Sequence, residues 1–337
     1  MKTFGTLFSG GEGVGIGLTA AGLTHLWGVE YDADIAAVAQ RNGFGVHVAD
    51  VRSVDYASLP RVDWLHASPV CTRASVANAN ATEAQEDIDT AAGVVRALKA
   101  QQPDVFTLEN VWGYRDFAAF RLILNALGDG GYFYDFEHVN CADFGVPQTR
   151  RRLILRASRG LLPFLPEPVP WVGWYEAIAD LIPTLPESKL APWQLARLPQ
   201  ELREHVLFSS NGNNDSFGDH HVEAHDPALS VTAQGLGRAR AVLITANGSA
   251  GDTFDASKPR ECCRRWSEQA QTIGANEHGS KAITGASVVS MTPRALARFQ
   301  SVPDWYELPD KRTLAARVIG NMVPPLLMQR IAEGMLQ

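Results

Sequence analysis

The stretch Thr3-Phe-Gly-Thr-Leu-Phe-Ser-Gly-Gly-Glu-Gly-Val-Gly-Ile-Gly17 decides the fold, because a short apolar run breaks into a glycine-rich turn. Residues 3–8 predict a strand, and the residues after the turn continue as a helix. Glycines in such a turn let a ligand approach the backbone, whose free amides lie at the N-terminus of the next helix. A tight strand-to-helix turn without a ligand has the same appearance, so the turn alone does not identify a binding site.

The first half of the chain alternates strand and helix patterns. Apolar runs at 26–29, 46–48, 63–67 and 105–108 predict strands, and 91–101 predicts an amphipathic helix. Strands that alternate with helices indicate an α/β fold with a mostly parallel sheet.

The pattern changes after residue 160, where Leu161-Leu-Pro-Phe-Leu-Pro-Glu-Pro-Val-Pro-Trp171 has the composition of a linker. The following stretch is irregular, and its strand-like runs at 241–245 and 287–291 predict a smaller β-rich domain. Ile319-Gly-Asn-Met-Val-Pro-Pro325 is read as the opening of a C-terminal helix, with proline tolerated in its first turn.

Composition excludes several classes of protein. The 337 residues are 45% hydrophobic and carry a net charge of −7, which is typical of a globular chain and excludes a polybasic protein. The four cysteines form no CxxC pair, so neither a disulfide framework nor a structural zinc site is expected. Without a membrane-spanning run or a secretory signal, we expect a cytoplasmic protein.

Acidic residues follow two of the predicted strands. Glu30 lies about twenty residues beyond the glycine-rich turn, where an acid that binds ribose hydroxyls would be placed, and Asp50 ends the next strand. Together with the turn, they favour a cofactor that contains adenosine. These residues alone leave a nicotinamide dinucleotide open.

Cys71 and Glu109 each follow a predicted strand. A lone cysteine is usually a small buried apolar residue, but Cys71 lies in a proline-containing loop at a strand end, where a nucleophile could act. Glu109 could be a solvated acid. If the two strands are neighbours, however, both side chains open onto one cleft as a nucleophile and an acid.

The segment Gln148-Thr-Arg-Arg-Arg152 precedes another apolar strand. Strand alternation places Gln148, Arg150 and Arg152 on one face. A row of arginines is usually a solvated surface, but the position beside a predicted sheet favours a local site for an anion or a carbonyl group.

These segments, taken in order, resemble the DNA (cytosine-5)-methyltransferase family. The resemblance covers most of residues 3–159 and 290–337. It rests on LFSGGEGVGIG, Glu30, Asp50, SPVC, ENV, QTRRR, RALARFQSVPDW and GNMVPP.

The resemblance implies a Rossmann-like fold that depends on S-adenosylmethionine, with a smaller target-recognition domain. Residues 1–165 plus 312–337 would form the catalytic and cofactor-binding domain. Residues 166–311 would form the target-recognition domain, with a hinge segment at 292–305. The cofactor would be bound by Phe8, Ser9, Gly10, Gly13, Glu30, Asp50, Val51 and Asn321.

The resemblance also implies a chemical mechanism. Cytosine C5 is a poor nucleophile, and attack of the Cys71 thiolate on C6 would activate it. Glu109 would hold N3 and the exocyclic amine of the base. Arg150 and Arg152 would support the loop and the base carbonyl, and their positive charge would favour the thiolate. The cytosine would have to leave the duplex to reach Cys71.

The sequence departs from the family at three positions. Thr6 stands where the family usually has aspartate, and Val70 and Thr72 replace proline and glutamine on either side of Cys71. No reacting group is lost by these changes, but they put the path of the catalytic loop in doubt.

Double-stranded DNA is the partner that the resemblance implies. The candidate DNA-binding residues are Arg73, Ser75, Gln148, Arg238 and Arg240. His220, His221 and His225 lack a well-spaced fourth ligand, so no metal site is expected. We expect a monomer in the cytoplasm of a bacterial or phage-infected cell, with or without a cognate restriction endonuclease.

Two further functions remain open: a methyltransferase that modifies cytosine C5 in transfer RNA, and a catalytically silent relative that binds the cofactor. Val70 favours the silent relative, whereas retention of Cys71 together with Glu109 argues against it. The basic residues concentrate at 150–152, at 264–265 and in the C-terminal segment. On an acidic chain, this distribution predicts a narrow basic cleft that makes few phosphate contacts.

Overall fold

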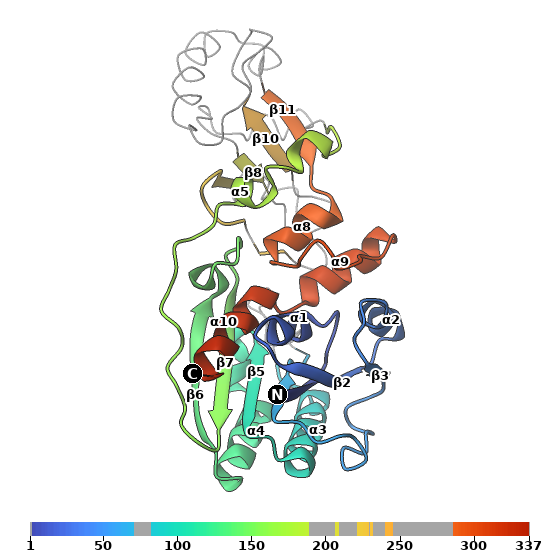
Figure 1. Cartoon of the computed structure of the whole chain (residues 1–337), viewed down its shortest axis with the longest axis vertical. Coiled ribbons are helices and arrows are strands. Elements are labelled where there is room, and N and C mark those ends of the chain that lie inside the picture. Colours follow the sequence, from blue (N-terminus) through green and yellow to red (C-terminus); the bar gives the residue numbers. More distant parts are fainter. Residues whose placement is uncertain are drawn as a thin grey trace.

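The computed structural model describes residues 2–70, 82–188, 206–208, 221–228, 230–231, 240–244 and 286–336. These residues form a larger lobe around a seven-stranded sheet and a smaller lobe around a four-stranded sheet (Figure 1). Both ends of the chain belong to the larger lobe (Figure 1).

The large sheet contains β1 to β7 in the order β3-β2-β1-β4-β5-β7-β6. Strand β7 runs antiparallel to both of its neighbours, and the other neighbouring strands are parallel. The strand order reverses between β1 and β4, and open α/β sheets bind ligands at such a reversal. The strands are β1 Thr3–Leu7, β2 Thr24–Glu30, β3 Val46–Val48, β4 Trp64–Ala67, β5 Val105–Asn110, β6 Phe133–Asn140 and β7 Arg151–Ser158.

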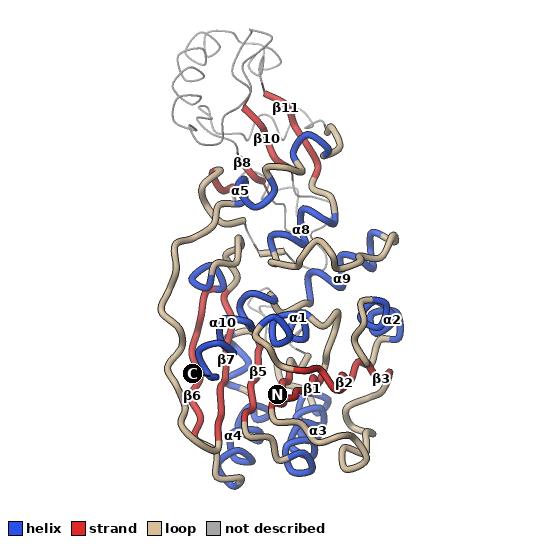
Figure 2. The backbone as a smooth tube through the Cα atoms, in the orientation of Figure 1, coloured by secondary structure: helices blue, strands red, loops and turns tan. Residues whose placement is uncertain are grey.

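Helices cover both faces of this sheet (Figure 2). Helices α3 (Gln85–Gln101) and α4 (Ala118–Asp129) pack on one face through an apolar core that includes Phe106 and Leu108. On the other face, α1 (Gly13–Ala20) and α10 (Pro325–Leu336) share a core with β1 and β4. The mostly parallel α/β sheet expected from the alternating pattern is therefore confirmed.

The smaller lobe contains an antiparallel sheet in the order β11-β10-β8-β9. The predicted runs at 241–245 and 287–291 correspond to β10 and β11, each displaced by one residue. The elements of this lobe are β8 Val206–Phe208, β9 His221–Glu223, β10 Arg240–Ile244, β11 Ala286–Ser290, α5 Trp174–Ile178 and the short turn η3 Ile182–Thr184.

A shared apolar core joins the two lobes. It contains Trp174 from α5, Phe299 from α8 (Pro293–Phe299) and Ile319 from α9 (Arg312–Asn321). Residues of α2 (Ala33–Arg41) in the larger lobe complete this core. The helices α8 and α9 therefore pack against apolar side chains of both lobes.

One sequence-based expectation is wrong. Ile319-Gly320-Asn321 does not open the C-terminal helix but forms the last turn of α9. Met322 has extended backbone angles (φ −67°, ψ 136°), and α10 begins only at Pro325. Two consecutive prolines disfavour helical geometry in the residues that precede them, which separates the two helices.

Among the residues that the structure describes, no helix has both the length and the apolar character required to cross a bilayer.

We expect the contact between α1 and α10 to depend on Gly17. A Cβ atom added there would lie 2.3 Å from the Pro325 carbonyl oxygen, so the two helices would have to separate. Gly17→Ala should therefore lower the free energy of unfolding by about 1–3 kcal/mol in urea denaturation. Gly128→Ala in α4 is the matched control: an added Cβ there meets nothing within 4 Å, and we expect a gain of up to about 1 kcal/mol. Equal effects of the two substitutions would contradict this account.

Candidate active site

The candidate site lies where β1 and β4 end side by side. These strands pair in parallel, and Leu7 is in register with Ala67. The chain then turns sharply, because Phe8 and Glu12 both adopt left-handed backbone angles (φ 55° and 60°). Residues other than glycine rarely adopt these angles. The backbone of the glycine-rich segment is thus folded tightly over the end of the sheet.

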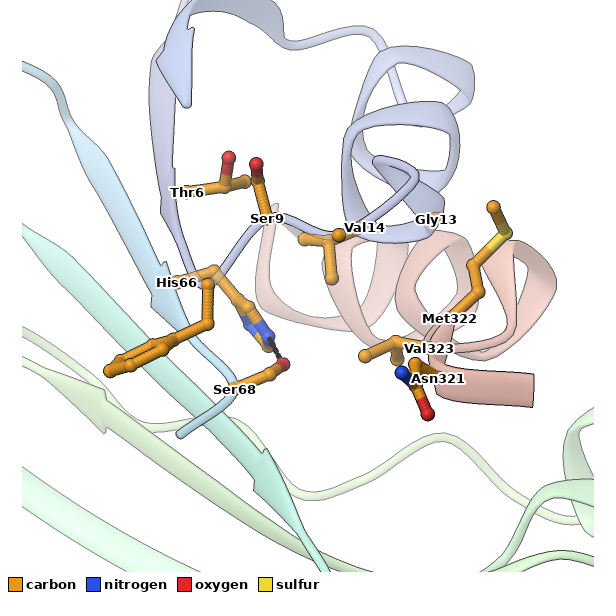
Figure 3. Close-up of a pocket in the computed structure, with 11 residues that line it drawn as sticks. Thr6, Ser9, Gly13, Val14, His66, Ser68, Asn321, Met322 and Val323 are labelled. Atoms are coloured by element: carbon orange, nitrogen blue, oxygen red, sulfur yellow. Dashed lines mark hydrogen bonds between the residues drawn. The ribbon is translucent and has the colours of Figure 1, made fainter. Parts of the chain in front are cut away.

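A pocket that is open to solvent occupies this position (Figure 3). Residues from β1, the glycine-rich turn, β4 and the connection between α9 and α10 line it. Five of the predicted cofactor-binding residues are brought together there: Phe8, Ser9, Gly10, Gly13 and Asn321. Six further lining residues were not predicted: Thr6, Val14, His66, Ser68, Met322 and Val323.

The three remaining predicted cofactor residues, Glu30, Asp50 and Val51, are not in the lining of this pocket. Glu30 accepts hydrogen bonds from the Gly10 amide (2.9 Å) and the Asp32 amide (2.8 Å), so its carboxylate braces the glycine-rich turn. Asp50 binds the Arg52 guanidinium at 2.6 Å, and this hydrogen bond lowers the pKa of Asp50. The Val51 carbonyl accepts a bond from the Tyr56 hydroxyl.

A buried acid that sequence reasoning missed lies behind the pocket. The carboxylate of Glu12 is fully buried, accepts a hydrogen bond from the Thr6 hydroxyl at 2.6 Å, and lies 3.3 Å from His25 Nε2. Side chains added at Gly15 or Gly28 would collide with this carboxylate, so the two glycines make room for it. Thr6 was noted only as a departure from the family, but its hydroxyl links the pocket to this acid.

His66 belongs to a second buried polar group. Its Nδ1 is hydrogen-bonded to the Thr107 hydroxyl (2.8 Å) and its Nε2 to the Ser68 hydroxyl (2.9 Å). The Trp64 indole N–H donates to the same Thr107 oxygen at 2.9 Å. Burial lowers the pKa of His66 to about 3, so the ring is neutral at physiological pH. No local pattern identifies His66 as a pocket residue, because its partner Thr107 lies on another strand.

Glu109 lies on β5, and β5 pairs with β4, so the two strands expected to be neighbours are neighbours. Glu109 is 7% exposed, and its Oε1 lies 2.8 Å from Arg152 Nε. The next residue, Asn110, is also buried and donates from its side-chain amide to the Pro69 carbonyl at 3.0 Å. This bond ties β5 to the segment that leads to Cys71.

Arg150 and Gln148 contact the smaller lobe. The Arg150 guanidinium donates to the carbonyls of Val231 and Gly320, in each case at 3.2 Å. The Gln148 side-chain oxygen accepts from the Val231 amide at 3.0 Å, and Gln148 is fully buried. The strand begins later than expected, because β7 starts at Arg151 and residues 148–150 precede it. Gln148 and Arg150 are buried, Arg152 is half-buried and Arg151 is exposed.

Several predicted residues lie outside the described residues, namely Cys71, Arg73, Ser75, Arg238 and His220. For Arg240 and His221 only the backbone is described, in β10 and β9. His225 is exposed, with Nε2 3.8 Å from Asp226 and 4.0 Å from Glu223. Within the described part of the chain, no group of three or more histidine, cysteine or acidic residues could hold a metal ion.

Comparison with known proteins identifies relatives over the whole chain. The family model described as "C-5 cytosine-specific DNA methylase" matches residues 2–337. Type II methyltransferase M.NgoBI of Neisseria gonorrhoeae is 30% identical over 180 residues, which cover 52% of this chain and 56% of the relative. Type II methyltransferase M.XorII of Xanthomonas oryzae pv. oryzae is 28% identical, with 72% of this chain and 61% of the relative covered. The alignments thus span less than two thirds of these two relatives.

The fold also resembles that of a solved structure. The methyltransferase EhMeth of Entamoeba histolytica aligns with a TM-score of 0.64 at 13% identity, covering 100% of this chain and 98% of that one. At this identity the likeness concerns the fold alone.

We expect His66 to make stability depend on pH. The unfolded chain binds a proton at the ordinary histidine pKa of 6.5, whereas the native ring stays neutral down to about pH 3. Between these values the unfolded state binds more protons, so stability falls as the pH falls below 6.5. From about pH 7.5 to pH 5, His66 should remove about 2 kcal/mol from the free energy of unfolding.

The measurement is urea unfolding of the wild-type protein and of His66→Gln at both pH values. The variant should lose less stability on acidification than the wild type, by that amount. Parallel pH profiles for the two proteins would show that His66 is not the group that titrates.

Proposed function

The chain belongs to the family of C-5 cytosine-specific DNA methylases, and we propose that it methylates carbon 5 of a cytosine within a specific sequence of duplex DNA. The observation that carries the proposal is the arrangement at the end of the sheet. The pocket between β1 and β4 adjoins the segment that leads to Cys71, and the buried pair of Glu109 and Arg152 lies on the neighbouring strand. A methyl donor, a nucleophile and an acid can thus meet at one edge.

S-adenosylmethionine is the cofactor of this family, and the residues present fit it. The left-handed turn at Phe8 exposes backbone close to the pocket, and Ser9 and Asn321 supply polar groups in its lining. Glu30 and Asp50 lie at the ends of β2 and β3, where acids can bind the hydroxyls and the amine of an adenosine. When bound, this cofactor supplies a methyl group activated on a sulfonium sulfur.

We assign the nucleophilic step to Cys71. Its thiolate would form a bond to cytosine C6, and the ring electrons displaced to C5 would make that carbon able to accept the methyl group. Loss of the C5 proton to a base and elimination of Cys71 would then break the bond to C6 and restore the aromatic ring. The cysteine is regenerated, so the step balances without an oxidant or a reductant.

Glu109 is proposed to hold N3 and the exocyclic amine of the flipped cytosine. Its carboxylate is held by Arg152 at 2.8 Å on a buried strand, so little orientational freedom is lost when the base binds. Arg150 donates instead to the carbonyls of Val231 and Gly320. We therefore propose that Arg150 positions the smaller lobe and the Asn321 segment over the base, in place of a direct contact with the base carbonyl.

The proposal includes DNA contacts from both the catalytic domain and the smaller lobe. Arg73, Ser75, Arg238 and Arg240 remain candidates for contacts with DNA. For Gln148, the buried side-chain nitrogen Nε2 has no hydrogen-bond partner among the described residues, which leaves it able to donate. Because the relatives are named Type II methyltransferases, we propose a modification enzyme of a restriction-modification system, acting as a monomer in the cytoplasm.

Expression of the intact chain in a host without cytosine methylation should leave C5-methylcytosine in one short motif, detected by methylation-sensitive sequencing. Cys71→Ser should abolish the mark, and Glu109→Gln should slow it at least about 100-fold because the base loses its acidic partner. Cys141→Ser is the matched control: this cysteine is buried in the core, and burial raises the pKa of its thiol to about 12. It should keep the mark.

The competing functions give different outcomes in the same experiment. A mark found only in transfer RNA would select the RNA methyltransferase. Absence of any mark, with no covalent trapping of cytosine analogues by the intact chain, would select the catalytically silent relative.

Asn110 provides a test of how the nucleophile is positioned. Asn110→Leu removes the hydrogen bond to the Pro69 carbonyl, two residues before Cys71. Misplacement of a reacting group by about 1 Å can cost about 100-fold in rate, so kcat should fall by up to that factor. Affinity for S-adenosylhomocysteine, measured by calorimetry, should change little, and an equal loss of both would instead indicate general damage to the fold.

A further inference from the structure

The three consecutive arginines at 150–152 have different surroundings. Arg150 is buried and bonded to two carbonyl groups, and Arg152 is paired with Glu109. Arg151 alone of the three is exposed, and within the described part of the chain no acidic side chain forms an ion pair with it. The proposed function uses none of its positive charge.

A stacked group of aromatic and cationic side chains lies next to Arg151. The rings of Trp112 and His138 are stacked, with centroids 4.5 Å apart and an interplanar angle of 13°. The Arg115 guanidinium lies 4.1 Å from the Trp112 ring centroid, which is cation–π geometry. We call Arg115, Trp112, His138 and Arg151 the cationic stack.

The cationic stack lies at the same edge of the sheet as the proposed active site. Trp112 and Arg115 belong to the 3₁₀ turn η1 (Trp112–Asp116), which begins two residues after β5 ends at Asn110. His138 lies on β6, two residues before Asn140, and Asn140 is in register with Arg151 on β7. Glu109 on β5 is therefore three residues before Trp112, and Arg152 on β7 is next to Arg151.

At neutral pH the His138 ring in the cationic stack is uncharged and stacks on Trp112. Partial burial and the positive charges of Arg151 and Arg115 lower its pKa, so its ring is neutral near pH 7. Arg115 also lies 3.4 Å from Asp116, but both side chains remain substantially exposed, and such a pair is weak in water. Two guanidinium groups are thus available to an anion.

We propose that the cationic stack binds the phosphate backbone of the substrate duplex beside the target cytosine. This inference rests on the proposed function, because it takes DNA as the substrate. A chain with a net charge of −7 does not attract a polyanion through its overall charge, so contacts must come from local cations. Stacking on Trp112 holds the Arg115 guanidinium in place, so binding a phosphate orders it at little entropic cost.

The test measures how DNA affinity depends on salt. The probe is a fluorescently labelled duplex of about 30 base pairs and mixed sequence, titrated by anisotropy at about 50 and 200 mM salt. Each phosphate contact contributes about 0.9 to the slope of log affinity against log salt. The measured ratio is the affinity at about 50 mM salt divided by the affinity at about 200 mM salt. Arg115→Gln and Arg151→Gln should each make this ratio about 3.5-fold smaller than in the wild type. Arg151→Lys keeps the charge and should retain most of the slope.

Arg159→Gln is the matched control. Arg159 also lies over an aromatic ring, 5.0 Å from the centroid of Tyr132, but it follows the last residue of β7 at the opposite edge of the sheet. The Arg159→Gln protein should show the same slope of log affinity against log salt as the wild type. Equal affinities of all variants for S-adenosylhomocysteine would show that the fold is intact.

The two proposals fail in different ways. If wild-type protein binds the duplex with a normal salt slope and neither Arg115→Gln nor Arg151→Gln changes that slope, the cationic stack is not a phosphate site, and the proposed function is unaffected. If the wild-type protein shows no salt-dependent affinity for duplex DNA, both the inference and the DNA substrate are wrong.

Discussion

The parallel pairing of β1 with β4 is the constraint on which the rest of the structure depends. The register of Leu7 with Ala67 places two loops side by side, although about sixty residues separate them in the chain. One loop is the glycine-rich turn that lines the pocket, and the other leads to Cys71. The remaining strands extend the sheet outward from this pair, so Glu30 and Glu109 reach the same edge from opposite sides.

A second constraint is the junction between the lobes. Arg150 connects the β7 side of the sheet to Gly320 at the end of α9 and to Val231 in the smaller lobe. Carbonyl groups accept hydrogen bonds from Nη1 and Nη2 of the buried guanidinium, and their loss would leave a desolvated charge. Arg150 therefore ties the smaller lobe and the end of α9 to the end of the large sheet, which the proposed alignment of a DNA sequence with a single reacting base would require.

Buried polar side chains lie beside the pocket. Glu12 occupies a left-handed position where glycine would be less strained, and its carboxylate is enclosed by Thr6, His25 and two glycines. His66 is held by hydroxyl groups on both of its nitrogens. Strain and buried polarity of this kind persist where the surrounding structure fixes them, and they concentrate at functional sites. They provide a rigid floor for the pocket.

Sequence alone determined the strand ends and the groups placed on them, since strand periodicity and a glycine-rich turn are local patterns. These patterns placed the glycine-rich turn after one strand and placed Glu30 and Glu109 at the ends of two others. Only tertiary structure decided which of these groups meet. The Thr6–Glu12 bond and the partners of Arg150 were missed for this reason. The bond from Arg150 to Gly320 joins residues 170 positions apart, and the pairing of such distant groups depends on how strands and helices pack, which no local pattern encodes.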